Sequence, residues 1–422
     1  METIIGILCG VILPAFLIIV GIIFLIRLRF FFILKPFSVG KQIISSRGGF
    51  SSLAIALAGT LGIGNIVGVA SAIYMGGYGS IFWMWISAFF AMGLKYAEVY
   101  LGMKYRRKSK DGCYYGGAPY YIYEGVKEKH SENFAFIFGA IFAVFCVLNS
   151  FTTGNLVQIN AVSSLLPIPK IIFGIVFSAC GFFIVKRGIK RISKVSSVLI
   201  PVLSIFYIFL CIVILMKNVS SIPGAFFNIF KSAFSFRSFA FGSMGYTIME
   251  AIRYGTSRGI LSNEAGCGTS PSAHASSSNE DPHAQACLGI FEVFFDTLVL
   301  CTLTALVIIV SSPKSSLSPL SLILDAFDNG LGSLGRYGVI ISSILFAFAT
   351  LLTQYFYGIE SLNFITKSKR WKHIFLIFFF IITIVGSTIP MSLMWYISDF
   401  FLAIMTIINL IFLIYLRKKV AI

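Results

Sequence analysis

Long runs of apolar residues without a single charged side chain restrict most strongly how this chain can fold. Residues 4–26, 195–216 and 337–359 are such runs. About 20 apolar residues let a helix cross the ~30 Å hydrocarbon core of a bilayer. The run at residues 48–94 is about twice that length, so we expect two spans joined by the glycine-rich turn at residues 76–79. The sequence therefore predicts an all-α integral membrane protein.

The amino-acid composition excludes an ordinary soluble protein. Hydrophobic residues make up 57% of the 422 residues, charged residues make up 12%, and the mean hydropathy is +0.91. A soluble domain of this size exposes far more charge. The run at residues 4–26 follows Met1-Glu2 rather than a basic segment, so we expect a membrane helix and not a cleaved signal peptide. The eight cysteines lie singly without a CxxC motif, so we expect neither a disulfide framework nor a zinc site.

The apolar segments predict eleven spans in one transmembrane domain over residues 1–422. Their centres lie near Pro14, Gly62, Ser87, Ser150, Ala179, Ser204, Gly245, Leu300, Leu345, Ile382 and Thr406. With the N-terminus outside, 26 of the 33 Lys and Arg residues fall in inner loops and six in outer loops, while Lys95 lies within a span. Because cytoplasmic loops retain basic residues, we expect the N-terminus outside and the C-terminus inside. The net charge of +17 then reflects membrane orientation and contact with anionic lipid, not nucleic-acid binding.

The second predicted span carries the clearest functional signal. Gly59, Gly62 and Gly64 lie close together there, and each weakens a helix by roughly 1 kcal/mol. Asn65 follows at membrane depth and needs hydrogen-bond partners. The seventh predicted span repeats the theme with Gly242-Ser243-Met244-Gly245. Paired interruptions of this kind point to a transporter site, in which open N–H groups bind a carboxylate and open C=O groups bind a cation. Close helix packing is the alternative explanation of the glycines.

Two pairs of polar side chains at membrane depth have close spacing. Asn155 and Gln158 in the fourth span share a helix face. Their carboxamides could bind the ammonium or carboxylate of a substrate, or they could bridge two helices. Lys95 and Glu98 are three residues apart in the third span, and we expect them to neutralise each other.

Further acidic residues in the predicted spans are costly to bury unless they are paired or functional. Glu292 and Asp296 are four residues apart on one helix face and could pair with Arg253 or Arg258, or bind protons or sodium. We favour a structural gate network. The charges that we assign to gates or structural pairs are Lys95, Glu98, Arg253, Glu264, Glu292 and Asp296.

The polar stretch at residues 258–270 has a superficial likeness to a phosphate-binding loop. It lacks the lysine of GxxxxGK[ST], and no strand precedes it. His274 and His283 have no Cys or HExxH partner that would suggest zinc. We therefore expect no nucleotide and no resident cofactor. A membrane enzyme and a channel are weaker alternatives to a carrier, since interrupted spans in both halves favour a carrier.

Five motifs occur in order along most of the chain. They are Ala58-Gly59-Thr60-Leu61-Gly62-Ile63-Gly64-Asn65, Lys95-Tyr96-Ala97-Glu98, Asn155-Leu156-Val157-Gln158, Ala251-Ile252-Arg253-Tyr254-Gly255 and Ser262-Asn263-Glu264-Ala265-Gly266. From about Arg27 to Asp399 the chain resembles the alanine or glycine:cation symporter family.

This resemblance implies the inverted-repeat fold of neurotransmitter:sodium symporters. An extra N-terminal helix would occupy residues 1–34, with five-helix repeats at residues 48–216 and 238–416. The resemblance also implies sodium-coupled import of a small neutral amino acid, namely alanine, D-alanine or glycine, by alternating access. We expect a monomer in the bacterial cytoplasmic (inner) membrane, with sodium as coupling ion and no cofactor.

The resemblance implies that the substrate carboxylate binds the amides of Gly62, Ile63 and Gly64. Residues that would complete the pocket are Thr60, Asn65, Asn155, Gln158, Gly242, Ser243, Met244, Gly245 and Gln354. Sodium would lie between the carbonyls of Ala58 and Leu61 and the hydroxyl of Thr350.

The chain departs from the family at two places. Ala349 stands where a second hydroxyl is usual, and Thr353-Gln354 stands where a Gly-Trp pair is usual. The first departure leaves open coupling to protons instead of sodium, in which Glu250 or Glu292 would bind and release the proton. The second leaves serine or glutamine open as the substrate.

Overall fold

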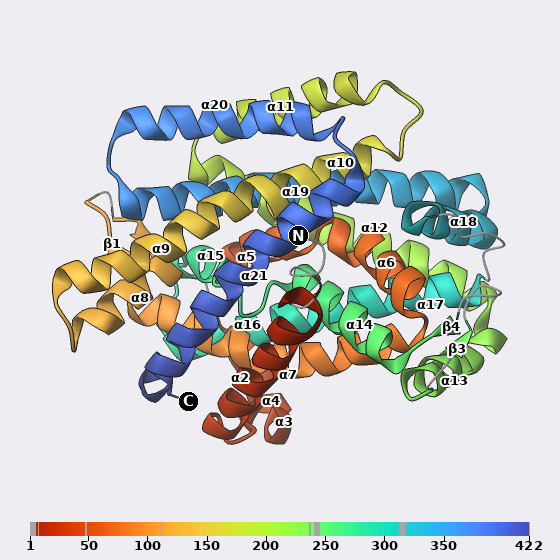
Figure 1. Cartoon of the computed structure of the whole chain (residues 1–422), viewed down its shortest axis with the longest axis horizontal. Coiled ribbons are helices and arrows are strands. Elements are labelled where there is room, and N and C mark those ends of the chain that lie inside the picture. Colours follow the sequence, from red (N-terminus) through yellow and green to blue (C-terminus); the bar gives the residue numbers. More distant parts are fainter. Residues whose placement is uncertain are drawn as a thin grey trace.

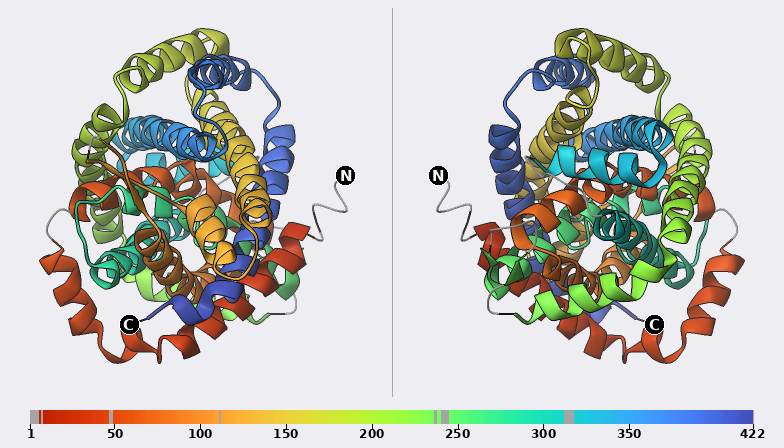
Figure 2. Two further views of the ribbon diagram at one scale, coloured as in Figure 1. Left: turned by 90° about the vertical axis from the view of Figure 1, so that its left-hand side faces the viewer. Right: turned by 90° about the vertical axis from the view of Figure 1, so that its right-hand side faces the viewer.

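The computed structural model describes residues 6, 8–46, 49–110, 112–235, 238–239, 245–311 and 318–421. Nearly all of this chain is helical, and the helices form one elongated bundle (Figure 1). Seen from either end, helices from the two halves of the sequence intermingle around the middle (Figure 2).

The helices of the first half are α2 (Leu13–Arg27), α3 (Phe31–Leu34), α4 (Pro36–Ser45), α5 (Gly49–Thr60), α6 (Val67–Gly76), α7 (Gly79–Lys104), α8 (Ala118–Lys127), α9 (Glu132–Phe151), α10 (Val157–Ser163), α11 (Lys170–Val185), α12 (Ile189–Lys217) and α13 (Ile222–Ala233). Those of the second half are α14 (Ile248–Asn263), α15 (Pro271–Ala275), α16 (Pro282–Val293), α17 (Thr302–Val310), α18 (Pro319–Leu331), α19 (Ser333–Ile365), α20 (Lys369–Gly386) and α21 (Met391–Leu416).

Shorter elements connect or interrupt these helices. Three are π-helical, namely η1 (Leu8–Ile12), η3 (Thr152–Leu156) and η5 (Phe294–Cys301). Three are 3-10 turns, namely η2 (Ile63–Asn65), η4 (Val219–Ser221) and η6 (Arg417–Lys419). Strand β1 (Arg107–Lys108) pairs antiparallel with β2 (Tyr114–Tyr115), and β3 (Ser238–Phe239) pairs antiparallel with β4 (Gly245–Tyr246).

Six helical segments in the described residues are long and apolar enough to cross a membrane. They are Leu8–Arg27, Glu132–Ser163, Ile189–Lys217, Pro282–Val310, Ser333–Ile365 and Leu393–Lys419. Shorter apolar helices are Gly49–Thr60, Val67–Gly76 and Lys170–Val185. The all-α membrane class is confirmed, whereas the eleven spans and the inverted repeats stay predictions.

The seventh predicted span was placed wrongly. Its expected centre, Gly245, lies in β4, and helix α14 begins only at Ile248. The reason is a capping box: the Thr247 hydroxyl accepts from the Glu250 amide (3.2 Å), and the Glu250 carboxylate accepts from the Thr247 amide (2.8 Å). Glu250 therefore caps the start of a helix. Residues 242–244 lie outside the described residues.

Helix α7 packs against many of the other helices in the bundle. It contacts α14 and α16 on one side and α2 on another. Gly21 permits the close approach of α2, because a methyl group there would lie 2.7 Å from Cβ of Phe90. On the opposite side of the bundle, α19 packs against α9, α12 and α5, and α11 packs against α20. Helices α5, α6 and α14 lie among these layers, which places their interruptions in the interior (Figure 1).

Candidate functional site

The helix formed by α5 and α6 is interrupted at residues 61–66, which we call the first break. In a continuous helix the Gly62 amide would donate to the carbonyl of Ala58. It donates instead to Oδ1 of Asn65 at 3.0 Å. The next amide, that of Ile63, donates to Oε1 of Gln158 at 3.0 Å. The open N–H groups of the first break are thus held by two neutral carboxamides, and the Ala58 carbonyl loses its usual donor.

Gly62 has no room for a side chain. A Cβ atom there would lie 2.6 Å from Oγ1 of Thr350 and 3.0 Å from Oε1 of Gln158. The backbone of the first break therefore lies directly against α19 and α10, and only glycine permits this approach.

Two of the three expected sodium ligands, Leu61 and Thr350, meet at this contact. The Thr350 hydroxyl lies 3.3 Å from the carbonyl oxygen of Leu61 and 3.1 Å from that of Phe346 in its own helix. Ala58 lies in the last turn of α5 and Leu61 directly follows that helix, where carbonyls lack regular helical donors. Two carbonyl oxygens and one hydroxyl are hard oxygen ligands, which suit a hard cation. The donor set therefore fits sodium.

The side chain of Asn65 joins the first break to two other helices. Its Nδ2 donates to Oδ1 of Asp296 (2.6 Å) and to the Ser262 hydroxyl (3.0 Å). Asp296 lies in the π-helical segment η5 and also accepts from the hydroxyls of Ser262 and Thr297, both at 2.8 Å. All these residues are buried. Pairing with an arginine, one of the alternatives that the sequence left open for Asp296, is not observed, and the partners of the carboxylate are uncharged donors.

A second interrupted helix faces the first. Helix α14 ends at Asn263 and α15 starts at Pro271, and we call residues 264–270 the second break. Glu264 (φ 48°), Gly266 (φ 85°) and Gly268 (φ 76°) adopt left-handed backbone conformations that end the helix. The sequence predicted an interruption at Gly242–Gly245, where residues 242–244 lie outside the described residues, and it did not predict the second break.

Glu98, Asn409 and Lys95 hold the second break through hydrogen bonds. Oε1 of Glu98 accepts from the Gly268 amide (2.8 Å) and from Nδ2 of Asn409 (2.6 Å). Asn409 also donates to the carbonyl of Gly266 at 2.8 Å. Lys95 donates to the Ser270 hydroxyl at 2.9 Å.

The predicted pairing of Lys95 with Glu98 is wrong. Lys95 forms its ion pair with Glu292, 3.3 Å away, and Glu292 also lies 3.1 Å from Nε2 of His274. Both ends of the Lys95–Glu292 pair are fully buried. Glu98 instead caps the second break, as described above. A carboxylate in a distant helix is thus the closer partner of Lys95.

The arginines are not partners of Glu292 or Asp296. Arg258 lies 3.6 Å from Asp399 in α21, and Arg253 stacks over the ring of Tyr254. Arg253 and Arg258 lie about two to three helical turns before the second break, whereas Glu292 bonds to Lys95 beside the second break. The predicted gate residues therefore do not form one network. Lys95, Glu98, Glu264 and Glu292 lie at the second break, Asp296 bonds to the first break, and Arg253 lies apart from both.

Gln354 lies one turn beyond Thr350 in α19 and reaches the second break. Its Nε2 donates to Oε1 of Glu264 at 2.6 Å, and the hydroxyl of Thr269 donates to the other carboxylate oxygen at 2.6 Å. The absence of a side chain at Gly154 leaves space for Gln354, because a Cβ there would lie 2.2 Å from Cβ of Gln354.

Asn155, Thr60 and Gly64 were also predicted to line the pocket, and each makes a different kind of contact. Asn155 donates to the carbonyl of Phe379 at 2.8 Å, which is the interhelical bridge that the sequence left open. The Thr60 hydroxyl bonds to carbonyls of its own helix. Gly64 packs against Ser262, since a Cβ there would lie 3.2 Å from Cα of Ser262.

Several residues of these networks were not predicted from the sequence. They are Ser262, Ser270, His274, Thr297 and Asn409. Asn409 had a usable signal, because a carboxamide within the last apolar span must find partners. The serines and threonines carried no such signal in the sequence, since isolated hydroxyl side chains are common in membrane helices.

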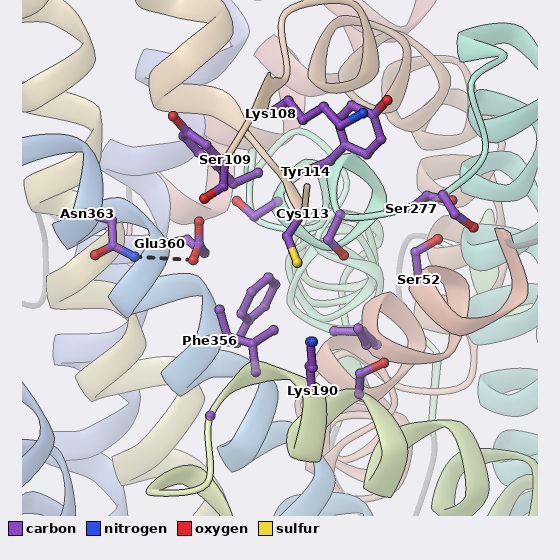
Figure 3. Close-up of a pocket in the computed structure, with 18 of the residues that line it drawn as sticks. Ser52, Lys108, Ser109, Cys113, Tyr114, Lys190, Ser277, Phe356, Glu360 and Asn363 are labelled. Atoms are coloured by element: carbon purple, nitrogen blue, oxygen red, sulfur yellow. Dashed lines mark hydrogen bonds between the residues drawn. The ribbon is translucent and has the colours of Figure 1, made fainter. Parts of the chain in front are cut away.

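A cavity of about 1060 Å³ opens at one end of the bundle. We call this the basic end, because Lys108, Arg187, Lys190, Lys367 and Lys372 line the cavity there. Figure 3 shows Ser52 of α5 and Phe356 and Glu360 of α19 along its walls. Glu360 accepts a hydrogen bond from Asn363 at 3.3 Å. The lining of the cavity ends at Ile55 in α5 and at Phe356 in α19, which lie six residues from Leu61 and from Thr350.

Comparisons with known proteins agree with the resemblance in the motifs. The sequence model of the sodium:alanine symporter family matches residues 1–422. The sodium/alanine symporter AgcS of Methanococcus maripaludis is 37% identical over 380 residues, which cover 88% of this chain and 82% of that protein. A Bacillus subtilis protein named "Probable sodium/glutamine symporter GlnT" is 33% identical over 377 residues, covering 88% and 76%. The amino-acid carrier protein AlsT of the same organism is 31% identical over 402 residues, covering 93% and 84%. The chain belongs to the sodium:alanine symporter family.

Proposed function

We propose that the protein imports a small neutral amino acid together with sodium by alternating access. The observation that carries this proposal is the way in which the first break is capped. Its amides at Gly62 and Ile63 donate to carboxamide oxygens of Asn65 and Gln158. A substrate carboxylate offers the same two oxygen acceptors with a negative charge, and charge-assisted hydrogen bonds are roughly twice as strong as neutral ones.

The carboxylate would take the place of one or both carboxamide oxygens at the first break. The displaced side chains of Asn65 and Gln158 would turn their NH₂ groups toward the ligand or keep their other partners. Asn65 already donates to Asp296, and Gln158 donates to the carbonyl of Thr153 at 3.3 Å. These bonds hold both side chains beside the amides, so the exchange needs no large movement.

Sodium would bind the carbonyls of Ala58 and Leu61 and the hydroxyl of Thr350. The Leu61 carbonyl and the Gly62 amide belong to the same peptide unit. A cation on that carbonyl polarises the peptide and makes the N–H group a better donor for the carboxylate. The two ligands would therefore raise each other's affinity, and such a coupling free energy is necessarily reciprocal.

Alternating access would connect this site to one end of the bundle at a time. The large cavity along α5 and α19 supports a route toward the basic end. Since inner loops retain basic residues, we assign the basic end to the cytoplasm, with the N-terminus outside. The membrane would be the bacterial cytoplasmic membrane, and the transporting unit a monomer built from inverted repeats.

Alanine, D-alanine and glycine are the substrates that we favour, and glutamine or serine is the alternative. Gln354, which is hydrogen bonded to Glu264, adds polar character beside the breaks. One relative is named as a sodium/glutamine symporter. Proton coupling is the alternative to sodium, and the buried contacts of Glu292 with Lys95 and His274 are the observation that favours it.

Uptake into proteoliposomes tests the proposal. Radiolabelled alanine, glycine, serine and glutamine should be compared under an imposed sodium gradient, a proton gradient and neither. We expect uphill, saturable uptake of a small neutral amino acid only with the sodium gradient. The variant Asn65→Ala should lose uptake while remaining in the membrane, whereas Asn160→Ala, which alters a buried carboxamide bonded to α20 and its following loop, should retain it. Uptake driven by protons alone, or normal uptake by Asn65→Ala, would contradict the assignment.

A further inference from the structure

A second cavity, of about 340 Å³, lies away from the basic end between α6, α14 and α21. Its lining includes Arg253, Arg258, Trp395 and Asp399, and we call it the arginine cavity. We propose that the arginine cavity binds the zwitterionic headgroup of an α-amino acid, with the carboxylate on Arg258 and the ammonium on Asp399. The proposal rests on the proposed function only for the class of ligand.

Arg258 is buried but makes little use of its donors. Its side chain is 10% exposed, and Nε and Nη1 are buried without a hydrogen-bond partner in the described part of the chain. The guanidinium lies 4.4 Å from the centre of the Trp395 ring, which fixes the plane of the group by stacking. Unpaired buried donors of a charged group are costly, so this planar fork is poised to bind two acceptor oxygens.

Asp399 faces Arg258 without bonding to it closely. The shortest distance from Nη1 of Arg258 to Oδ1 of Asp399 is 3.6 Å, whereas charge-assisted hydrogen bonds measure about 2.7–2.9 Å. Among the described residues, no hydrogen bond to the Asp399 carboxylate is found. The carboxylate, 16% exposed, therefore keeps acceptor capacity for an ammonium group.

The charges of the arginine cavity favour a zwitterion over a simple ion. Arg253 adds a second positive charge and packs against the first helix, since a Cβ at Gly10 would lie 2.6 Å from its Nε. A simple anion would satisfy Arg258 but would be repelled by Asp399. A simple cation would face two arginines. An amino-acid headgroup offers a carboxylate and an ammonium at a fixed short separation, so one ligand satisfies both partners.

The arginine cavity lies next to the central site. Arg258 precedes Ser262 by one helical turn, or about 6 Å of rise, and Ser262 bonds to Asn65 at 3.0 Å. Val67 and Ser71, which follow the first break in α6, line the same cavity. A volume of about 340 Å³ is within the range of small-molecule sites. A substrate held there would separate Arg258 from Asp399 and thereby loosen the contact between α14 and α21.

Equilibrium binding of radiolabelled alanine to the purified full-length protein in lipid nanodiscs tests this site. The variant Asn65→Ala removes the central site, so the binding that remains reports on the arginine cavity. We expect Asn65→Ala to retain about one alanine per chain. Adding Asp399→Asn or Arg258→Lys should weaken this binding at least about tenfold, because each change removes charged hydrogen bonds. Glycine and serine should compete with alanine, whereas propionate and ethylamine, which carry only one end of the headgroup, should not.

The control is Asp328→Asn, which makes the same chemical change in α18, a helix whose first residue, Pro319, lines the cavity. It should leave alanine binding unchanged. Arg258→Lys keeps the positive charge but loses the planar guanidinium group. If this variant is well folded and does not bind alanine, the binding site has been lost and the fold has not. The proposal would be overturned if Asn65→Ala bound no alanine, or if it bound alanine equally well with and without the change at Asp399 or Arg258. Full competition by propionate would also overturn it. Sodium-driven uptake by the wild type is measured separately. Absent uptake would contradict the proposed function, whereas absent alanine binding in Asn65→Ala would contradict only the arginine cavity.

Discussion

The two breaks differ in what holds their open backbone. At the first break, the amides of Gly62 and Ile63 donate to neutral carboxamides from Asn65 and Gln158. At the second break, the Gly268 amide donates to the carboxylate of Glu98. Both breaks are buried in the same bundle, so the difference does not arise from exposure to solvent.

This difference separates exchangeable contacts from permanent ones. A ligand carboxylate competes well with a neutral carboxamide oxygen, but it does not compete with a carboxylate that is already in place. We therefore expect substitutions at the second break to reduce stability and substitutions at the first break to reduce transport.

Removal of the buried cation beside the second break should have the largest effect. Lys95→Met leaves Glu292 fully buried with His274 as its remaining partner. Breaking a buried ion pair in this way costs about 3–5 kcal/mol, so the melting temperature in detergent should fall sharply. Lys231→Met, which alters an exposed lysine of α13, is the control. A variant with normal melting but no uptake would instead assign Lys95 to the transport cycle.

A methyl group at the first break should abolish transport with less loss of stability. In Gly62→Ala, the new Cβ would lie 2.6 Å from Oγ1 of Thr350 and 3.0 Å from Gln158, so it would obstruct both the ion ligands and the carboxylate site. We expect initial uptake rates to fall about 100-fold, or about 2.7 kcal/mol. Gly40→Ala is the matched control, because nothing lies within 4 Å of that position. Uptake within a few-fold of wild type would show that the first break does not bind substrate.

Loss of the Thr350 hydroxyl should weaken the response to sodium. Thr350→Val removes one of three expected oxygen ligands, and we expect the sodium concentration for half-maximal uptake to rise about tenfold, as for the loss of one charged contact. Thr383→Val is the control, since that hydroxyl is buried and bonds only to the carbonyl of Phe379 in its own helix. Identical sodium dependence in Thr350→Val and wild type would place the coupling ion elsewhere.

A surface ion pair remote from both breaks should give the smallest effect. The hydrogen bond from Lys419 lowers the pKa of Glu128, which lies just after α8. The stabilisation is present above the ordinary glutamate pKa and is lost as the pH falls through the lowered value. Because both side chains are more than a third exposed, the contribution is below about 1 kcal/mol. The melting temperatures of wild type and Glu128→Gln should differ slightly at pH 7 and converge near pH 3, and a gap that widens on acidification would reverse the expected sign.

The first break was predictable from the sequence because its cause is local. Gly59, Gly62 and Gly64 weaken the helix, and Asn65 supplies a nearby acceptor. The second break was not located, because its cause is a run of left-handed backbone at Glu264, Gly266 and Gly268 inside a polar stretch. That stretch has no apolar periodicity from which an interrupted span can be recognised.

The partners of the buried charges could not be predicted either. Sequence spacing suggested that Lys95 pairs with Glu98, three residues away, but Lys95 pairs with Glu292 in α16. Glu98 accepts a hydrogen bond from the amide of Gly268, which lies 170 residues further along the chain. Local spacing shows which side chains can meet on one helix. It does not show which helix packs alongside, and this packing decided the pairing.

If the first break binds both ligands, sodium and the amino acid should each raise the affinity of the protein for the other. Alanine binding should be titrated at zero and saturating sodium, and sodium binding with and without alanine, for wild type and Asn65→Ala. If the Leu61–Gly62 peptide joins the two sites, sodium should tighten alanine binding and alanine should tighten sodium binding by the same factor, and both effects should vanish in Asn65→Ala. Alanine binding to the wild type that is indifferent to sodium, or a coupling factor unchanged in Asn65→Ala, would contradict the account.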